Sequence, residues 1–439
     1  MLHSSLPQNR SSQGGWPDSS VLLGLVGKNR GHLDMTSTAA NPVRLTIGIC
    51  LLTLACIAPA ELPAFAEAAS VKKPASAKND QASGSPMTLK LRATGHSISI
   101  MVPPPSPGLT MNDSARAAPA ELTTSLRALW SSFPGKAGIA VMKGDGSWMV
   151  SYRGDEPMPQ QSVSKLWVSI AVMDAVDKGR LRLEDKVTLR RSDMTLFHQP
   201  IASLIGPNGY TTTIGALLQR AMTQSDNTAN DFLMRRVGGP TAIRDLIASK
   251  RLGAIRFGPG ERHFQAATAG LTWRPEYSSG WAFQNARASL PLSVRKSAMD
   301  KYVADPMDGA TPAAIARSLA RLKRGELLSA QSTRYLLNVM EHTATGRARL
   351  KAGVPAGWKL AHKTGTGQDL QSRTAGFNDV GIMTAPDGTS YTVAVMIADT
   401  KAPISYRQRL IQQVAATVVA SHRSGQFASR SSGVSASAN

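Results

Sequence analysis

The order of strand-like and helical segments along the chain constrains its fold more than any other feature. Runs typical of strands occur near both ends of the region from about residue 120 to residue 420, and helical spacing of apolar residues dominates from about 186 to 345. Strand groups at both ends favour a single sheet into which the middle is inserted as a second lobe. We therefore expect an α/β (α+β) fold, with an antiparallel sheet flanked by helices and an inserted all-helical lobe. The predicted strands are residues 138–142, 148–152, 358–362, 380–384 and 391–397.

Helices are predicted from apolar spacing and from residues that favour helix ends. The first begins near Pro119, because proline suits the first turn of a helix, and it carries Leu122, Leu126 and Leu129 at helical spacing. A second is expected over residues 162–178. The other predicted helices are residues 214–222, 229–237, 240–249, 312–322, 329–341 and 404–420.

The composition is that of a globular protein with a substantial core and a basic surface. The chain has 439 residues, is 42% hydrophobic and 18% charged, and carries a formal net charge of +21. Basic charge often indicates nucleic-acid binding, but no motif interleaves aromatic and basic residues for stacking on bases. We predict no nucleic-acid partner. The positive charge then has one of two roles. It attracts the protein weakly to anionic cell-envelope polymers, or it belongs to a surface that is simply well solvated.

The N-terminal region has the pattern of a secretory signal peptide. Arg44 precedes an apolar run over residues 45–60, and the Ala-Phe-Ala of residues 64–66 forms a small-residue cleavage site. We expect cleavage after Ala66 and export to the periplasm or the medium. Two alternatives are an uncleaved membrane anchor and lipidation of Cys56.

The rest of the chain divides by composition. Met35 lies just ahead of a signal peptide of ordinary length, so residues 35–66 are taken as the signal and residues 1–34 as an extension upstream of the true start. Residues 67–115 are rich in Ala, Ser, Pro and Lys and are predicted to be a disordered linker. A catalytic domain is expected over residues 116–423, followed by a disordered tail over residues 424–439.

Cysteine usage and histidine spacing limit the chemistry. Cys50 and Cys56 are the two cysteines of the chain, and both precede the expected cleavage site. No histidine pair has metal-ligand spacing beside a carboxylate or thiolate. A cysteine nucleophile and a zinc site are therefore poorly supported, and we predict no metal and no cofactor.

Three short motifs occur in order, each in a local context that suits nucleophilic catalysis. Alone each is weak, since Ser-x-x-Lys also occurs at Ser70–Lys73 and Ser293–Lys296. The motifs are Ser162-Val163-Ser164-Lys165, Ser225-Asp226-Asn227 and Lys363-Thr364-Gly365. Together they resemble a set found in class A β-lactamases and penicillin-binding proteins.

The residue types in these motifs suit acyl transfer. A serine hydroxyl needs a base before it attacks, and Lys165 lies one helical turn from Ser162. The N-terminus of that helix offers N–H groups to a developing oxyanion. Ser225 can relay a proton to a leaving nitrogen and Asn227 can hydrogen-bond a substrate amide. Lys363 places a positive charge beside both serines and attracts an anionic substrate.

Residues 120–422 resemble class A β-lactamases. The resemblance is carried by residues 162–181, 222–240, 355–367 and 378–381. It implies an acyl-enzyme formed by a β-lactam on the nucleophilic serine, which water then hydrolyses. It further implies substrate contacts from Thr364 and Gly365, an oxyanion hole from the N–H groups of Ser162 and Thr366, and help from Arg373 in holding the substrate carboxylate.

Deacylation separates a β-lactamase from a penicillin-binding protein. By the resemblance, the glutamate that activates water lies 36 residues beyond the serine of Ser-Asp-Asn, which is Glu261 here, and Gln265 falls where the family has a water-holding amide. The flanks depart from the family, because its Trp-Glu-Pro is replaced by Gly260-Glu261-Arg262. Glu276 is a rival, and a chain without such a base is the third alternative.

A second departure is an excess of roughly 30 residues over the family norm, at about 267–303. This segment either caps the cleft or packs on the helical lobe. The predicted function is β-lactam hydrolysis by a monomer. The rivals are a D-alanyl-D-alanine carboxypeptidase, transpeptidase or esterase on the same fold, and a non-enzymatic wall-binding relative, which would lack the serine or the lysine of the first motif.

Overall fold

The computed structural model describes residues 88–93, 96–101 and 117–435, in two compact units. In the first unit, β1 (Thr88–Ala93) pairs antiparallel with β2 (His96–Met101). This hairpin departs from the predicted disordered linker. Apolar and polar residues alternate along both segments, the pattern of a strand. The predicted signal peptide lies outside the described residues.

The second unit is built on an antiparallel sheet with the central order β4–β3–β11–β10–β7. Strands from the two ends of the unit meet where β11 pairs with β3, with Val393 opposite Val141. Two short strands, β8 and β9, join at the end beside β11. The strands are β3 (Gly135–Lys143), β4 (Met149–Tyr152), β7 (Lys359–Thr366), β8 (Asp369–Leu370), β9 (Arg373–Thr374), β10 (Phe377–Thr384) and β11 (Ser390–Thr400).

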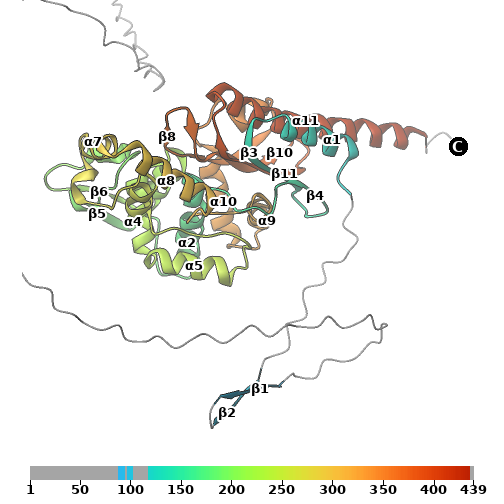
Figure 1. Cartoon of the computed structure of the whole chain (residues 1–439). Coiled ribbons are helices and arrows are strands. Elements are labelled where there is room, and N and C mark those ends of the chain that lie inside the picture. The colour runs from blue at the N-terminus through green and yellow to red at the C-terminus, as the bar shows by residue number, and fades with distance from the viewer. Residues whose placement is uncertain (1–87, 94–95, 102–116, 436–439) are drawn as a thin grey trace, which may run out of the picture. The chain divides into compact units, whose positions relative to one another are not determined.

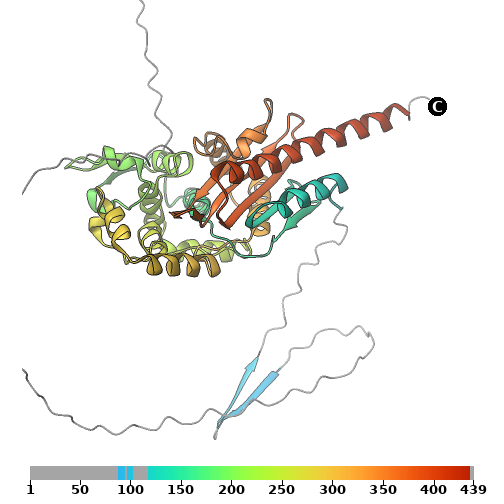
Figure 2. The ribbon, with the colours of Figure 1, turned by 45° about the horizontal axis from the view of Figure 1, so that its top comes forward.

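Helices cover both faces of this sheet (Figures 1 and 2). On one face, α1 (Ala120–Ser131) and α11 (Ile404–Ser435) enclose one hydrophobic cluster with the sheet, which includes Leu126 and Val414. On the other face, α9 (Pro312–Lys323) and α10 (Ala330–Glu341) pack over β11, β3 and β7. The long strands are buried almost throughout because both of their faces are covered.

The middle of the chain forms a helical lobe, so the predicted fold class is confirmed. It also contains a two-stranded hairpin and short 3₁₀ turns. Its helices are α3 (Ile214–Thr223), α4 (Asn227–Arg236), α5 (Gly239–Ser249), α6 (Glu261–Thr268), α7 (Ala282–Ser289) and α8 (Leu292–Ala304). The hairpin is β5 (Lys186–Leu189) with β6 (Tyr210–Thr213), and the lobe's 3₁₀ turns are η2 (Arg191–Asp193), η3 (Pro200–Leu204) and η4 (Pro275–Ser278). Two further 3₁₀ turns lie outside the lobe: η1 (Gln161–Ser164) precedes the central helix, and η5 (Leu350–Gly353) contacts α11.

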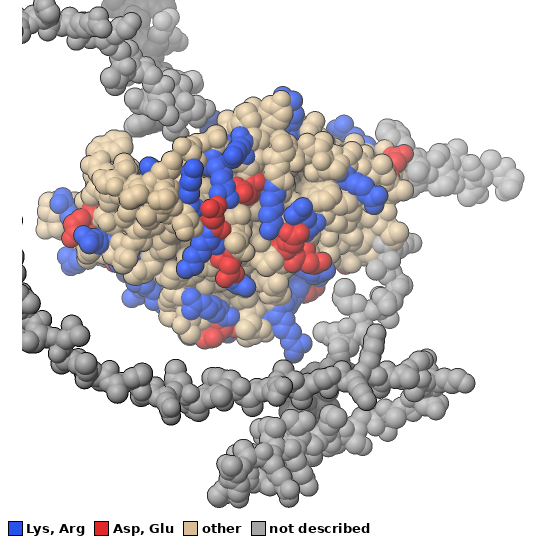
Figure 3. Space-filling view, viewed as in Figure 1, with Lys and Arg blue, Asp and Glu red and all other residues tan. Residues whose placement is uncertain are grey.

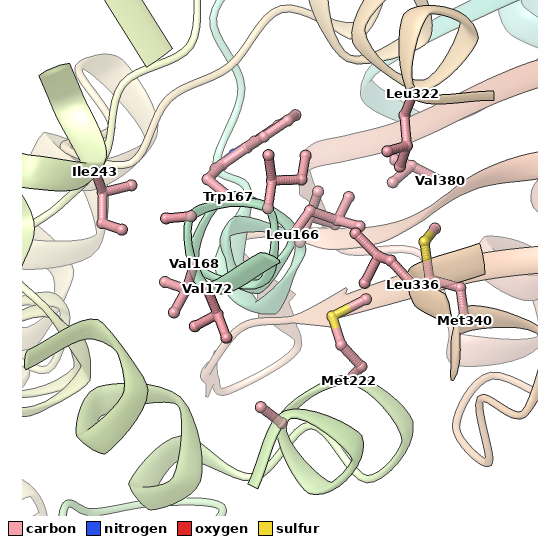
Figure 4. Close-up of a cluster of buried hydrophobic side chains, with 14 of the residues drawn as sticks. Leu166, Trp167, Val168, Val172, Met222, Ile243, Leu322, Leu336, Met340 and Val380 are labelled. Atoms are coloured by element: carbon pink, nitrogen blue, oxygen red, sulfur yellow. The ribbon is translucent and has the colours of Figure 1, made fainter. Parts of the chain in front are cut away.

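Helix α2 (Lys165–Asp177) runs through the centre of the second unit, between the sheet and the lobe. Figure 4 shows Leu166, Trp167, Val168 and Val172 projecting from it in different directions toward apolar side chains of surrounding elements. A helix that is apolar on all sides is stable only when buried. This burial fixes the position of the turn that precedes the helix, where Ser162 lies.

Helix α11 is longer than predicted. The sequence analysis placed its end near residue 420 and a disordered tail from 424, whereas the helix continues to Ser435. The chain beyond residue 403 contains no proline, so each of its residues can donate its backbone N–H to a continuing helix. Among the described residues, no helix combines the length and apolarity needed to cross a membrane.

Candidate active site

The site is centred on the 3₁₀ turn η1, which lies between β4 and α2 along the chain. Ser162 lies half-buried in η1, and Lys165 is the first residue of α2. In a 3₁₀ turn, residues three apart lie almost directly above one another. The Nζ atom of Lys165 accordingly lies 3.1 Å from the Oγ atom of Ser162.

The ammonium of Lys165 joins three parts of the chain. Besides Ser162, it donates to Oδ1 of Asn227, at 2.9 Å, and forms an ion pair with Glu261. The lysine is fully buried and Glu261 is only 4% exposed. A buried charge is stable when it is paired and its hydrogen-bonding capacity is filled. The three partners supply this to Lys165.

Glu261 begins helix α6, which hydrogen bonds at both of its turns hold in place. The backbone N–H of Glu261 donates to Oδ1 of Asp231, at 2.9 Å, and Nε2 of Gln265 donates to the second carboxylate oxygen of Glu261, at 3.1 Å. Burial and the charge of Glu261 raise the pKa of Asp231 to about 6. One oxygen of the Glu261 carboxylate therefore accepts from Lys165 and the other from Gln265.

Helix α6 needs a glycine before its first residue. Gly260 has φ +95°, and a Cβ atom there would lie 2.8 Å from the Cε atom of Met234. Glycine adopts this conformation without strain. The replacement of the family's tryptophan by Gly260 therefore has a local structural reason in this chain.

The Ser-Asp-Asn motif is held in a strained turn at the start of α4. Ser225 has φ +60°, a left-handed conformation that non-glycine residues rarely adopt. Asp226 caps α4 by accepting from the N–H of Ala229, at 2.9 Å, and it also accepts from the N–H of Ile201, at 2.6 Å. These bonds orient Ser225 and Asn227 toward the two lysines.

Lys363 lies on β7 and is fully buried. Its Nζ atom donates to Oγ of Ser225 and to the carbonyl of Thr364, both at 2.9 Å. Burial, with a further contribution from the positive charge of Lys165, holds the pKa of Lys363 well below its usual value. The two lysines and two serines of the motifs thus surround one small volume.

Strand β7 runs close to the turn that carries Ser162. A Cβ atom on Gly365 would lie 2.3 Å from the carbonyl oxygen of Gln160, so glycine is required for this approach. The hydroxyl of Thr364 bonds that of Thr345, at 2.7 Å, and Thr366 is exposed at the end of the strand. The Lys-Thr-Gly motif therefore lies beside Ser162.

Arg373 does not join this cluster, because its guanidinium is paired with Asp399 and Asp300. Arg349, which the sequence analysis did not single out, contacts the site instead. It donates to the carbonyls of Gly365 and Asn378, at 3.1 and 2.7 Å, and to the hydroxyl of Thr366. No spacing rule marks an arginine between two helical segments as part of this strand edge, so the sequence offered no signal for it.

The rival glutamate and the extra segment lie on the helical lobe. Glu276 is exposed in η4. Tyr277 packs edge-on against Trp273 and Phe283, and α8 contributes Met299 and Tyr302 to a cluster with Phe264. Much of the segment thus packs against the lobe, while Trp281 is 74% exposed. Among the described residues, no group of three or more His, Cys, Asp or Glu side chains could hold a metal ion.

This fold, with a serine and two lysines meeting between a sheet and a helical lobe, defines a class of serine hydrolases. Residues 121–421 match the family model described as "Beta-lactamase enzyme family". The chain belongs to this family of enzymes, in its class A branch.

Named relatives and solved structures agree. The chain is 26% identical to β-lactamase VEB-1 and 30% identical to extended-spectrum β-lactamase PER-1, both of Pseudomonas aeruginosa; each match covers 64% of this chain, and 83% and 80% of the relatives. A crystal structure of a β-lactamase from Chitinophaga pinensis is 26% identical, covering 68% of this chain and 97% of that one, with a TM-score of 0.56. TLA-3 extended-spectrum β-lactamase is 25% identical, covering 68% and 96%, also with a TM-score of 0.56.

Proposed function

We propose that the protein hydrolyses β-lactam antibiotics through an acyl-enzyme on Ser162. The observation that carries this proposal is the position of the Lys165 ammonium, which contacts both the Ser162 hydroxyl and the Glu261 carboxylate. One group for attack and one for water activation are thus linked through a single buried cation. The β-lactamase activity named for the relatives supports the same substrate class.

In acylation, Ser162 Oγ attacks the β-lactam carbonyl carbon and passes its proton to the Lys165–Glu261 pair. The N–H groups of Ser162 and Thr366 receive the charge that develops on the carbonyl oxygen. The lactam C–N bond then breaks, and Ser225 gives its proton to the leaving nitrogen and regains one from the Lys165–Glu261 pair, which leaves Glu261 as a carboxylate for the next step. Lys363, which donates to Ser225, stabilises the serine oxygen during this transfer.

Side chains with an unused hydrogen-bond donor or a positive charge orient the substrate. Asn227 accepts from Lys165 and donates one N–H to the carbonyl of Leu196, at 3.1 Å, which leaves its second amide N–H for a substrate carbonyl. The positive charge of Lys363 attracts the substrate carboxylate, and Thr364 and Thr366 line its path. We assign to Arg349 the supporting role expected of Arg373, because Arg349 contacts Thr366.

Deacylation requires a base beside the ester. In the proposed mechanism Glu261 takes a proton from water, and the water oxygen attacks the acyl carbon. The ester C–O bond then breaks, and the proton held by Glu261 passes to Ser162 Oγ, which restores the starting state. Gln265, bonded to Glu261, helps hold that water. The exposed position of Glu276 favours Glu261 for this role.

Steady turnover of nitrocefin by the purified protein tests the proposal. A β-lactamase gives many turnovers per enzyme molecule. A carboxypeptidase, transpeptidase or esterase would give one burst and a persistent adduct by intact mass spectrometry. Absence of both turnover and labelling would favour the non-enzymatic relative.

We further propose that the protein acts as an exported monomer. Residues 35–66 supply the signal, and N-terminal sequencing of the exported protein should begin at Glu67; an intact residue 35 in the mature form would refute cleavage. On the face shown in Figure 3, basic side chains are dispersed, with acidic ones among them. Such dispersion supports weak, salt-sensitive attraction to anionic polymers at most.

A further inference from the structure

The residue immediately before the nucleophile is held by an unusual set of contacts. Gln161 has φ +54° and is buried. Its backbone N–H donates to Oδ2 of Asp308, at 2.7 Å, and its side-chain Nε2 donates to the hydroxyl of Tyr302, at 2.8 Å. A non-glycine residue keeps a left-handed conformation only where its surroundings enforce it. Asp308 and Tyr302 supply that constraint.

Tyr302 closes a ring of hydrogen bonds. Its hydroxyl donates to the carboxylate of Asp308, at 3.1 and 3.2 Å from the two oxygens, while accepting from Gln161. Burial, with the nearby charge of Asp308, raises the pKa of Tyr302 well above its usual value. The hydroxyl therefore keeps the proton with which it donates to Asp308.

The side chain of Gln161 also reaches the strand edge that follows Thr366. A Cβ atom on Gly367 would lie 2.9 Å from Nε2 of Gln161, and one on Gly376 would lie 2.8 Å from its Cγ atom. Gly376 thus makes room for this side chain, whereas at Gly367 an added Cβ atom would also meet the carbonyl oxygen of Ala375, at 1.9 Å. Gln161 consequently connects the turn of Ser162 to the strand end that carries Thr366.

We propose that Tyr302 is a positioning residue for acylation: through Gln161, its hydroxyl sets the spacing between the backbone N–H groups of Ser162 and Thr366. The inference rests on the proposed function, since those two groups are its oxyanion donors. Tyr302 belongs to α8, at the end of the extra segment. The segment thereby contributes directly to the geometry of the reaction centre as well as to packing.

A purely structural tyrosine would need only its ring. The ring of Tyr302 packs edge-on against Phe264, with centroids 5.6 Å apart, and phenylalanine preserves that contact. Tyr302→Phe therefore removes the hydroxyl while leaving the packing in place. Tyr277→Phe is the matched control, because Tyr277 lies in the same segment and packs against Trp273 and Phe283.

The decisive measurement separates acylation from deacylation. Loss of a whole oxyanion donor costs about 10²–10³-fold, so a misplaced donor in Tyr302→Phe should slow acylation by a fluorescent penicillin about tenfold. Hydrolysis of the preformed acyl-enzyme should slow by a comparable factor, because attack by water again places charge on the carbonyl oxygen that the same two N–H groups receive. Tyr277→Phe should match the parent. Parental acylation rates in Tyr302→Phe, or slowing of deacylation alone, would overturn the proposal.

A double-mutant cycle distinguishes loss of the contact between Tyr302 and Gln161 from a general folding defect. Gln161→Met keeps the approximate shape of the side chain and removes the amide that bonds Tyr302. If the two residues act as a unit, the double variant should acylate no more slowly than the worse single variant. Additive losses would refute the coupling. Failure of the proposed function would appear separately, as absence of nitrocefin turnover in the parent.

Discussion

Lys165 and Glu261 form a buried ion pair although 96 residues separate them along the chain. The lysine begins the central helix and the glutamate begins a short helix of the other lobe. Removing one member of such a pair leaves an uncompensated buried charge, which typically costs about 3–5 kcal/mol. A shape-preserving replacement is therefore the better probe of either residue.

Ser162→Ala should abolish covalent labelling by a fluorescent penicillin while the protein stays folded. The substitution removes one half-buried hydroxyl, and Lys165 keeps Asn227 and Glu261 as partners. Ser169→Ala, in the helix α2 that follows this turn, is the control and should label like the parent. Gel fluorescence measures the labelling, and thermal unfolding shows whether the variant is folded. Labelling that persists in Ser162→Ala would refute the assignment of Ser162 as the nucleophile.

Glu261→Gln should acylate and then stop. The amide keeps the shape of the side chain and loses the basicity, and loss of a general base typically costs about 10²–10⁴-fold. Intact mass spectrometry should show a stable adduct after a single burst. Glu276→Gln is the matched control, and if it alone accumulated the adduct, Glu276 would be the base. An adduct that accumulates on the parent would favour the carboxypeptidase alternative.

The KM for anionic β-lactams should rise as the pH increases. This rise should begin at a lower pH than the pH at which an ordinary exposed lysine loses its charge. Burial lowers the pKa of Lys363, so its ammonium, which attracts the substrate carboxylate, is lost as the pH rises through that lowered value. Lys363→Arg keeps its charge over this range and should remove the rise. A substrate whose carboxylate is esterified should show no such rise in KM with either the parent or Lys363→Arg. An identical pH profile for parent and Lys363→Arg would contradict the prediction.

Arg349→Gln should raise KM for carboxylate-bearing substrates by about tenfold or more, the worth of one charge-assisted hydrogen bond. Arg373→Gln should change KM little, because the Arg373 guanidinium is paired with Asp399 and Asp300. Steady-state kinetics on folded protein, checked by thermal unfolding, compares them. The reverse pattern would restore Arg373 to the role first predicted for it.

Local rules predicted the parts of this protein that local physics decides. Apolar periodicity placed the predicted helices and strands of the second unit within a few residues of their observed bounds, except for the C-terminal end of α11, and it did not predict β5, β6, α6, α7 or α8. The pattern also predicted that sheet strands from both ends of the unit would pair, and β11 does pair with β3. Ser162 and Lys165 meet because residues three apart share one face of a helical turn.

Other features were predicted incompletely because several weak signals compete. The hairpin β1–β2 lies in a segment whose Ala, Ser and Pro content favoured a linker, and α11 continues through small residues that favoured a disordered tail. Glu261 was inferred from its spacing in a family resemblance, and its contacts with Lys165 and Gln265 came only with the structure. Composition describes a segment on average, whereas pairing depends on the register of individual residues.

The sequence by itself determined the order of the predicted elements, the three motifs and the lysine nearest Ser162. Only the tertiary structure decided that Arg349 and not Arg373 reaches Thr366, and that Tyr302 reaches Gln161 from 141 positions away. The physical reason is range. Backbone geometry links residues three or four apart whatever the rest of the chain does, whereas contacts between distant residues exist only after the sheet and the lobe have packed around α2.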